Sequence, residues 1–186
     1  MRRDQELVQI VDTAMAEAVR RSGSWLACRV GCTECCLGPF PITPLDAARL
    51  REGWAELDAA DPERAARVRE RAQASAARLR SEFPDDTVAR VLECDEAAAD
   101  EPCPALDPET GACDLYTARP ITCRTFGPAV RLTSESADHR VGVCELCYQG
   151  ATDEQIAACE VEVDIRGEAL ENRPDTFVAF ALADAS

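Results

Sequence analysis

The sequence contains no lysine: all 20 of its basic residues are arginine. A lysine Schiff base and the lysine of a phosphate-binding P-loop are therefore excluded. Aromatic residues are also few, at 5% of the chain, although 46% of it is hydrophobic. A core built mainly from Ala, Leu, Val and Ile favours packed helices over a β-sandwich.

Positive charge is outweighed by negative charge, and the formal net charge at pH 7 is -15. This balance argues against nucleic acid or an anionic membrane surface as a partner. We find no apolar stretch of membrane-spanning length, and no apolar run near the start of the chain that would mark a secretory signal. We therefore expect a cytoplasmic protein whose thiols are kept reduced.

Cysteine, in contrast, is abundant, with eleven residues in the chain. Four of them, Cys28, Cys32, Cys35 and Cys36, lie within nine positions. An odd total in a reducing compartment makes a disulfide framework the less favoured alternative. Crowded thiols in such a compartment are most often metal ligands, because thiolate is a strong donor for zinc and for iron.

The spacing within this first group indicates more than one metal ion, or a cluster. Cys32-x2-Cys35 has the reach to place two thiolates on one tetrahedral ion, and Cys28 is close enough to join them. We expect the adjacent side chains of Cys35 and Cys36 to point in diverging directions. The two would then serve different ions, or one of them would bridge two ions.

A second group, Cys103, Cys113 and Cys123, lies in a turn-rich segment with many Pro and Gly residues. Their wide spacing does not form a local chelate, but it lets the segment fold back so that the sulfurs converge on the first group. Arg119 and Arg124 bracket Cys123. Either they offset the charge of bound thiolates or they pair with surface carboxylates, and the sequence leaves both alternatives open.

The remaining cysteines and the single histidine divide into two sets. Cys144-x2-Cys147 is a second close pair; no βαβ pattern surrounds it, so ligation is favoured over a thioredoxin-like redox role. Cys94 and Cys159 lie in helical patterns, where a buried cysteine usually acts as a small hydrophobe. His139 lies in a polar turn, where a single histidine is more often exposed to solvent than bound to a metal. The roles of these last three residues stay open.

The fold class that the pattern predicts is mainly α: a single helical domain, residues 1–186, with irregular cysteine-rich loops and one small β-hairpin. Thr43-Pro44 and Asp61-Pro62 are helix starts, because a capping side chain precedes a proline in the first turn. The predicted helices cover 4–22, 43–57, 61–83, 85–98, 152–170 and 173–182, and the predicted hairpin strands are 129–132 and 141–143.

The cysteine pattern resembles that of the YkgJ-type cysteine-cluster family (CxxCxxCC), described as a zinc- or iron-chelating domain. The matching residues are Cys28, Cys32-x2-Cys35-Cys36, Cys103-Pro-x-Leu and Gly-x-Cys113-x-Leu-Tyr-x-x-Arg-Pro-x-x-Cys123-Arg-x-Phe126. The resemblance implies around eight cysteines at a metal centre, so Cys144 or Cys147 should complete the set. The core motif then spans 28–147, with a helical insertion at about 43–98.

We therefore predict a metal-binding protein that holds a polynuclear zinc or iron site, the iron form including an iron–sulfur cluster. The domain also occurs in a flagellin lysine methylase, so the alternative is an iron-dependent redox or S-adenosylmethionine-dependent methyl-transfer enzyme. Whether the chain is an enzyme stays open. The predicted ligands are Cys28, Cys32, Cys35, Cys36, Cys103, Cys113, Cys123, Cys144 and Cys147.

Overall fold

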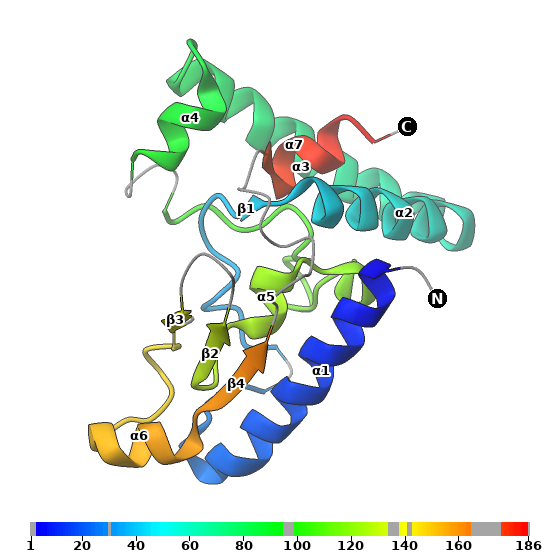
Figure 1. The fold of residues 1–186 in the computed structure, drawn as a ribbon. Coiled ribbons are helices and arrows are strands. Elements are labelled where there is room, and N and C mark those ends of the chain that lie inside the picture. Colours follow the sequence, from blue (N-terminus) through cyan, green and yellow to red (C-terminus); the bar gives the residue numbers. More distant parts are fainter. Residues whose placement is uncertain are drawn as a thin grey trace. The chain divides into compact units, whose positions relative to one another are not determined.

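The computed structural model describes residues 3–29, 31–94, 99–133, 138–140, 143–164 and 176–185. The chain forms two compact units, which we call unit 1 and unit 2. Each is assembled from two segments that are distant in the sequence. Unit 1 comprises Met1–Arg29 and Ile121–Asn172, and unit 2 comprises Val30–Pro120 and Arg173–Ser186. The mainly α character that the composition predicts is confirmed (Figure 1).

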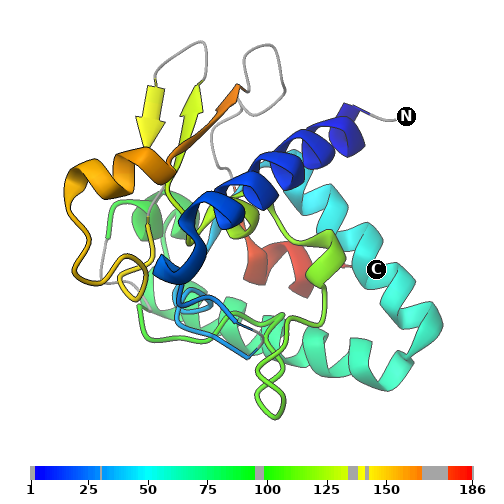
Figure 2. The ribbon, with the colours of Figure 1, turned by 90° about the horizontal axis from the view of Figure 1, so that it is seen from below.

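Unit 1 packs a long helix against a small sheet. Strand β2 pairs with β3 in antiparallel and with β4 in parallel orientation, so the strand order is β3-β2-β4. Helix α1 packs against β4, α5 and α6, and Figure 2 shows α1 in blue beside the orange β4. The elements are α1 (Arg3–Ser22), α5 (Ile121–Thr125), β2 (Val130–Thr133), β3 (Asp138–Arg140), α6 (Asp153–Cys159) and β4 (Val161–Asp164).

Unit 2 is built on two long helices joined at a single capping residue. Asp61 ends α2 and begins α3, because its side chain accepts a hydrogen bond from the Arg64 amide at 3.1 Å. Thr43 caps the start of α2 in the same way. Both predicted starts are confirmed. The elements are β1 (Pro41–Ile42), α2 (Pro44–Ala60), α3 (Pro62–Glu82), α4 (Thr87–Leu92), the 3-10 turn η2 (Tyr116–Ala118), β5 (Thr176–Phe177) and α7 (Val178–Ala183).

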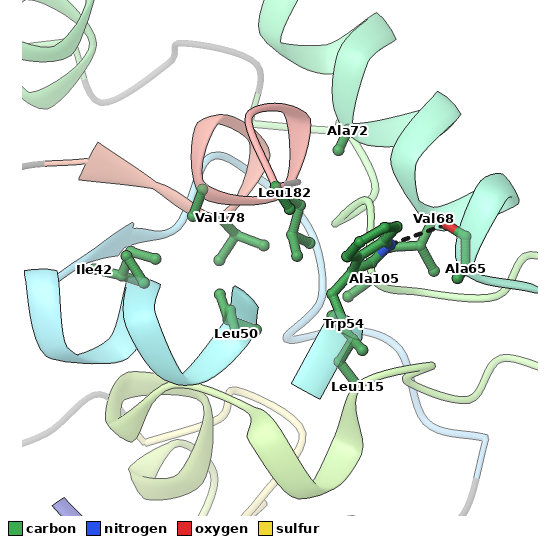
Figure 3. Packing of buried hydrophobic residues seen from close by; sticks show 13 residues of the cluster. Ile42, Leu50, Trp54, Ala65, Val68, Ala72, Ala105, Leu115, Val178 and Leu182 are labelled. Atoms are coloured by element: carbon green, nitrogen blue, oxygen red, sulfur yellow. Dashed lines mark hydrogen bonds between the residues drawn. The ribbon is translucent and has the colours of Figure 1, made fainter. Parts of the chain in front are cut away.

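The core of unit 2 lies where α2, α3 and α7 meet (Figure 3). Helix α3 contributes a narrow apolar stripe that includes Ala65, Val68 and Ala72, all fully buried, as its helical spacing predicts. Trp54 of α2 packs against this stripe, and its Nε1 donates a hydrogen bond to the Ala65 carbonyl at 3.1 Å. Small residues on α3 therefore leave room for the ring of Trp54.

A close approach between α2 and η2 depends on Gly53. A Cβ at this position would lie 2.3 Å from the Cβ of Ala118, which is far inside van der Waals contact. Only glycine lets the two segments pack at this distance. The turn that follows Cys113 is thus held directly against α2.

The structure corrects three boundaries. The predicted helix 152–170 is shorter, because α6 ends at Cys159 and β4 follows it. In β4, buried Val161 and Val163 alternate with exposed acidic residues, which is the period of a strand. The hairpin forms, but its second strand is β3 rather than 141–143; residues 141 and 142 lie outside the described residues. In the predicted helix 85–98, only α4 is helical, and residues 95–98 lie outside the described residues.

Two further observations concern burial and the chain ends. Leu92 is the last residue of α4, and its side chain is exposed. The apolar C-terminal helix is confirmed as α7, although residues 173–175 lie outside the described residues. Among the helices in the described ranges, none has both the length and the apolar character needed to cross a bilayer. The single-domain organisation stays a prediction.

The different burial of Leu79 and Leu92 gives a matched test of the unit 2 core. Leu79 is 1% exposed and Leu92 is 43% exposed. We expect Leu79→Ala to lower the free energy of unfolding by about 3 kcal/mol, because it removes buried methyl groups and leaves a cavity. Leu92→Ala should cost less than about 1 kcal/mol. Urea unfolding of the two variants checks this, and equal losses would contradict the packing described above.

Candidate metal centre

All eleven cysteines carry free thiols. Unit 1 contains four of the nine predicted ligands and unit 2 contains the other five. In unit 1 they are Cys28, Cys123, Cys144 and Cys147; in unit 2 they are Cys32, Cys35, Cys36, Cys103 and Cys113.

In unit 1, residues far apart in the sequence bring two sulfurs together. The Sγ atoms of Cys28 and Cys147 lie 3.9 Å apart. A disulfide needs about 2.05 Å, so the two thiols are not bonded to each other. Two thiolates on one tetrahedral zinc, each about 2.3 Å from the ion, lie about 3.8 Å apart. The separation therefore fits two ligands of a single ion.

The CxxC turn of unit 1 is held by backbone hydrogen bonds. The Cys147 amide donates to the Cys144 carbonyl at 2.8 Å, which closes the turn. The Cys144 amide donates to the Gly127 carbonyl at 3.3 Å, and Val143 forms a bridge with the same glycine. Burial is the main cause that raises the pKa of Cys144, followed by the charge of neighbouring Cys147. This environment favours the protonated thiol of Cys144, so a metal ion would have to displace its proton.

Tyr148, which directly follows the CxxC pair, ties three segments of unit 1 together. Its amide donates to the Trp25 carbonyl at 2.8 Å. Its hydroxyl lies 2.6 Å from the Ser22 hydroxyl and accepts a hydrogen bond from the Ala129 amide at 2.9 Å. Its φ of 56° is unusual for a residue with a side chain and reverses the chain after Cys147. Sequence reasoning missed this residue; a bulky aromatic next to a CxxC pair is the signal that could have found it.

Gly127 lies against the sulfur of Cys28. A Cβ at this position would be 3.1 Å from the Cys28 Sγ, and the φ of Gly127 is +118°. The positive φ favours glycine, because a side chain would strain the backbone, and a Cβ would also press on the thiol. The sequence resemblance stops one residue earlier, at Phe126, so this position was also missed.

Cys123 and Cys159 have different settings in unit 1. Cys123 lies in α5, next to Arg124, whose Nη1 donates to both carboxylate oxygens of Asp12 on α1 at 2.9 Å. Of the two alternatives for Arg124, pairing with a carboxylate is therefore the one observed. Cys159 is buried in the cluster that contains Cys144 and Cys147, and its Sγ contacts the Arg21 carbonyl at 3.5 Å. It packs as a small hydrophobe with a weak hydrogen bond.

In unit 2, the first cysteine group forms a tight turn. The Cys36 amide donates to the Thr33 carbonyl at 2.8 Å. The thiols of Cys35 and Cys36 interact with each other, so their side chains do not diverge as we expected. The turn bends the backbone enough for the adjacent thiols to meet. The hydrogen bond with Cys36, and then burial, raise the pKa of Cys35 far above its usual range.

A short antiparallel pairing brings the second group beside the first. Leu37 and Pro102 form an antiparallel β-bridge, and the Cys103 amide donates a hydrogen bond to the Cys36 carbonyl at 2.8 Å. The chain therefore folds back so that the Cys103 backbone lies beside that of Cys36, as predicted. Within the following loop, Leu106 bridges Cys113, which brings the chain back toward Cys103.

Burial keeps the thiols of this loop protonated in the absence of metal. It raises the pKa of Cys103 to about 12, with the nearby charge of Cys113 adding to the effect. It also raises the pKa of Cys113. Arg119 acts in the opposite direction, because its positive charge lowers the pKa of both Cys35 and Cys113. This supports the alternative that Arg119 offsets the charge of bound thiolates. The Arg119 guanidinium also stacks on the Tyr116 ring, 4.0 Å from its centroid.

Among the described residues, no three His, Cys, Asp or Glu side chains are arranged so that together they could hold a metal ion. What the structure does present is sulfurs in pairs, such as Cys28 with Cys147. Sulfur donors of this kind suit zinc and iron rather than magnesium or calcium. Cys94 is exposed, and His139 lies in β3 with its side chain outside the described residues.

The family comparison agrees with this donor chemistry. Residues 27–161 match the model of the CxxCxxCC family, described as "Putative zinc- or iron-chelating domain". The chain belongs to this family. The predicted resemblance is thus confirmed, and the match extends beyond the predicted core motif of residues 28–147. No curated protein and no solved structure matches the chain.

The contact between Gly127 and Cys28 can be tested with a matched glycine. Gly150 also has a positive φ, of +77°, but a Cβ there would meet nothing within 4 Å. Both Gly127→Ala and Gly150→Ala should lose about 1 kcal/mol through backbone strain. Only Gly127→Ala should also weaken zinc binding, because it displaces the Cys28 thiol. Zinc affinity measured by chelator competition checks this; equal affinities in the two variants would contradict the contact.

Proposed function

We propose that this chain binds more than one zinc or iron ion through cysteine thiolates. The main support for the proposal is that the sulfurs of Cys28 and Cys147 lie 3.9 Å apart. These two residues stand at opposite ends of the predicted core motif. The proposed ligands are Cys28, Cys32, Cys35, Cys36, Cys103, Cys113, Cys123, Cys144 and Cys147.

The number of thiols in each unit supports more than one ion. A structural zinc site takes four ligands. Unit 1 supplies four of the proposed thiols and unit 2 supplies five, so each unit carries enough sulfur for one closed site. Iron–sulfur clusters are also held by four cysteines, so the same count suits either metal. The contact between Cys35 and Cys36 adds a further reason, since adjacent thiols in contact can bridge two ions.

The charges around the thiols are consistent with binding that releases protons. Burial holds Cys103, Cys113 and Cys144 in the neutral form. A divalent ion replaces these protons and leaves a thiolate site with net negative charge. In unit 2, Arg119 offsets part of that charge. Such chemistry needs reduced thiols, and we therefore propose that the protein works in the cytoplasm.

A cavity in unit 2 favours one second candidate, an enzyme. It has a volume of about 470 Å³, and Cys103, Arg71 and Arg78 are among the residues that line it. Small-molecule sites fall in this range of size. An iron centre beside such a cavity could serve redox chemistry or methyl transfer from S-adenosylmethionine. Saturable binding of S-adenosylmethionine by the metal-loaded protein, lost when Arg71 is replaced by Gln, would favour the enzyme over a structural metal site.

The proposed function is tested by elemental analysis and absorption spectroscopy of protein purified without oxygen. We expect zinc or iron in more than one equivalent per chain. Cys103→Ser should lower the metal content, because it removes a buried thiol of the proposed site. Cys94→Ser is the matched control; Cys94 is exposed and lies outside the family's cysteine groups, so this variant should keep the full content.

The absorption spectrum shows whether the bound metal is iron or zinc. Iron–sulfur or iron–thiolate centres absorb in the visible, whereas a zinc–thiolate protein is colourless. A parent protein with no bound metal would refute the proposal. So would equal metal content in Cys103→Ser, Cys94→Ser and the parent, because Cys103 would then not be a ligand.

A further inference from the structure

We infer that helix α3 holds the loop of Cys103 and Cys113 in place before any metal binds, by means of a clamp formed by Arg64, Arg71 and Asp114. The inference rests on the proposed function in one respect: it assigns positioning residues to two of the proposed ligands. It also gives a role to the helical insertion, which has no sequence motif of its own.

The clamp is a carboxylate gripped by two guanidinium groups. Arg64 Nε lies 2.5 Å from Asp114 Oδ1, and Arg71 Nη2 lies 2.6 Å from Asp114 Oδ2. The Asp114 side chain is only 2% exposed. Because each carboxylate oxygen has its own arginine, the carboxylate is fixed in both position and rotation.

The same helix also holds the other end of the loop. Arg71 Nε donates to the Pro104 carbonyl at 2.9 Å, directly after Cys103. The Asp114 amide donates to the Ala105 carbonyl at 2.7 Å. One arginine therefore contacts the residue that follows each of the two cysteines, and the two ends of the loop are joined to each other.

The core fixes the loop from its other side. Ala105 and Leu115 belong to the buried cluster of unit 2, and Figure 3 shows both beside Trp54. Cys103 and Cys113 pack against that cluster. The backbone next to each cysteine is thus held between apolar packing and an ion pair, neither of which requires a metal.

The spacing of the two arginines explains why a helix can form this clamp. Arg64 and Arg71 are seven residues apart, which places them two turns apart on one face of α3. Asp114 would be a poor residue to bury alone, because an unpaired buried carboxylate is strongly destabilising. The two arginines compensate the charge of the buried carboxylate, and the cysteine before it is positioned as a result.

The test replaces Asp114 by Asn, which keeps the shape of the side chain and removes its charge. The matched control is Asp58→Asn, at an exposed site on α2. Both are made in a Trp25→Phe background, so that Trp54 alone reports on the unit 2 core. Two quantities are compared: hydrogen exchange of residues 103–115 in metal-free protein, and zinc affinity by chelator competition.

We expect Asp114→Asn to exchange at least about tenfold faster in this loop than Asp58→Asn, because the clamp no longer opposes local opening. Its zinc affinity should fall about 10–100-fold, which is the usual effect of losing a partner that orients a ligand. Trp54 emission should remain that of a folded core. Arg71→Gln, which removes one of the two arginines, should give a smaller change in the same direction, with exposed Arg67→Gln as its control.

The possible failures are distinguishable. Loop exchange and zinc affinity that match between Asp114→Asn and Asp58→Asn would overturn the clamp. A parent protein that binds neither zinc nor iron would refute the proposed function, yet faster loop exchange in Asp114→Asn would still support the clamp. If Asp114→Asn unfolds the core, the Arg71→Gln variant tests the clamp instead. Hydrogen exchange of the loop and zinc affinity that match those of Arg67→Gln would then overturn the inference.

Discussion

Three ion pairs attach cysteine-bearing segments to the two longest of the described helices, α1 and α3. In unit 2, Asp114 is gripped by Arg64 and Arg71 of α3, and in unit 1 the buried Arg124 pairs with Asp12 of α1. In both cases the charged residue directly follows a cysteine. Breaking a buried pair by removing one partner typically costs about 3–5 kcal/mol, because a charge is left without compensation. The helices therefore do more than cover a core: they set where the thiols are.

This anchoring reconciles a largely irregular cysteine segment with a defined set of sulfur positions. Backbone hydrogen bonds, such as that from the Asp107 amide to the Ala112 carbonyl, close the loop from Cys103 to Cys113. Packing and α3 hold the residues on either side of it. In unit 1, Tyr148 and Gly127 do the equivalent for Cys147 and Cys28 through hydrogen bonds and close approach. Sulfurs held in this way bind an ion at a smaller entropic cost than sulfurs on free loops.

The sequence predicted the features that depend on local chemistry. The helix starts at Thr43 and Asp61 and the helix over 61–83 were confirmed, and so was the family, because its cysteine spacing is specific. Features that depend on distant partners were missed. Nothing near Cys159 in the sequence shows that the next residues pair in parallel with β2, and the clamp on Asp114 joins residues about fifty positions apart. Cys35 and Cys36 were expected to diverge, but they lie in a turn and their thiols interact.

The most direct test of the account is X-ray absorption at the metal edge of protein purified without oxygen. If anchored thiols hold the ions, the nearest shell should consist of sulfur, with about four atoms at about 2.3 Å for zinc. A shell made of nitrogen or oxygen alone would contradict the account, because thiols would then not be the ligands.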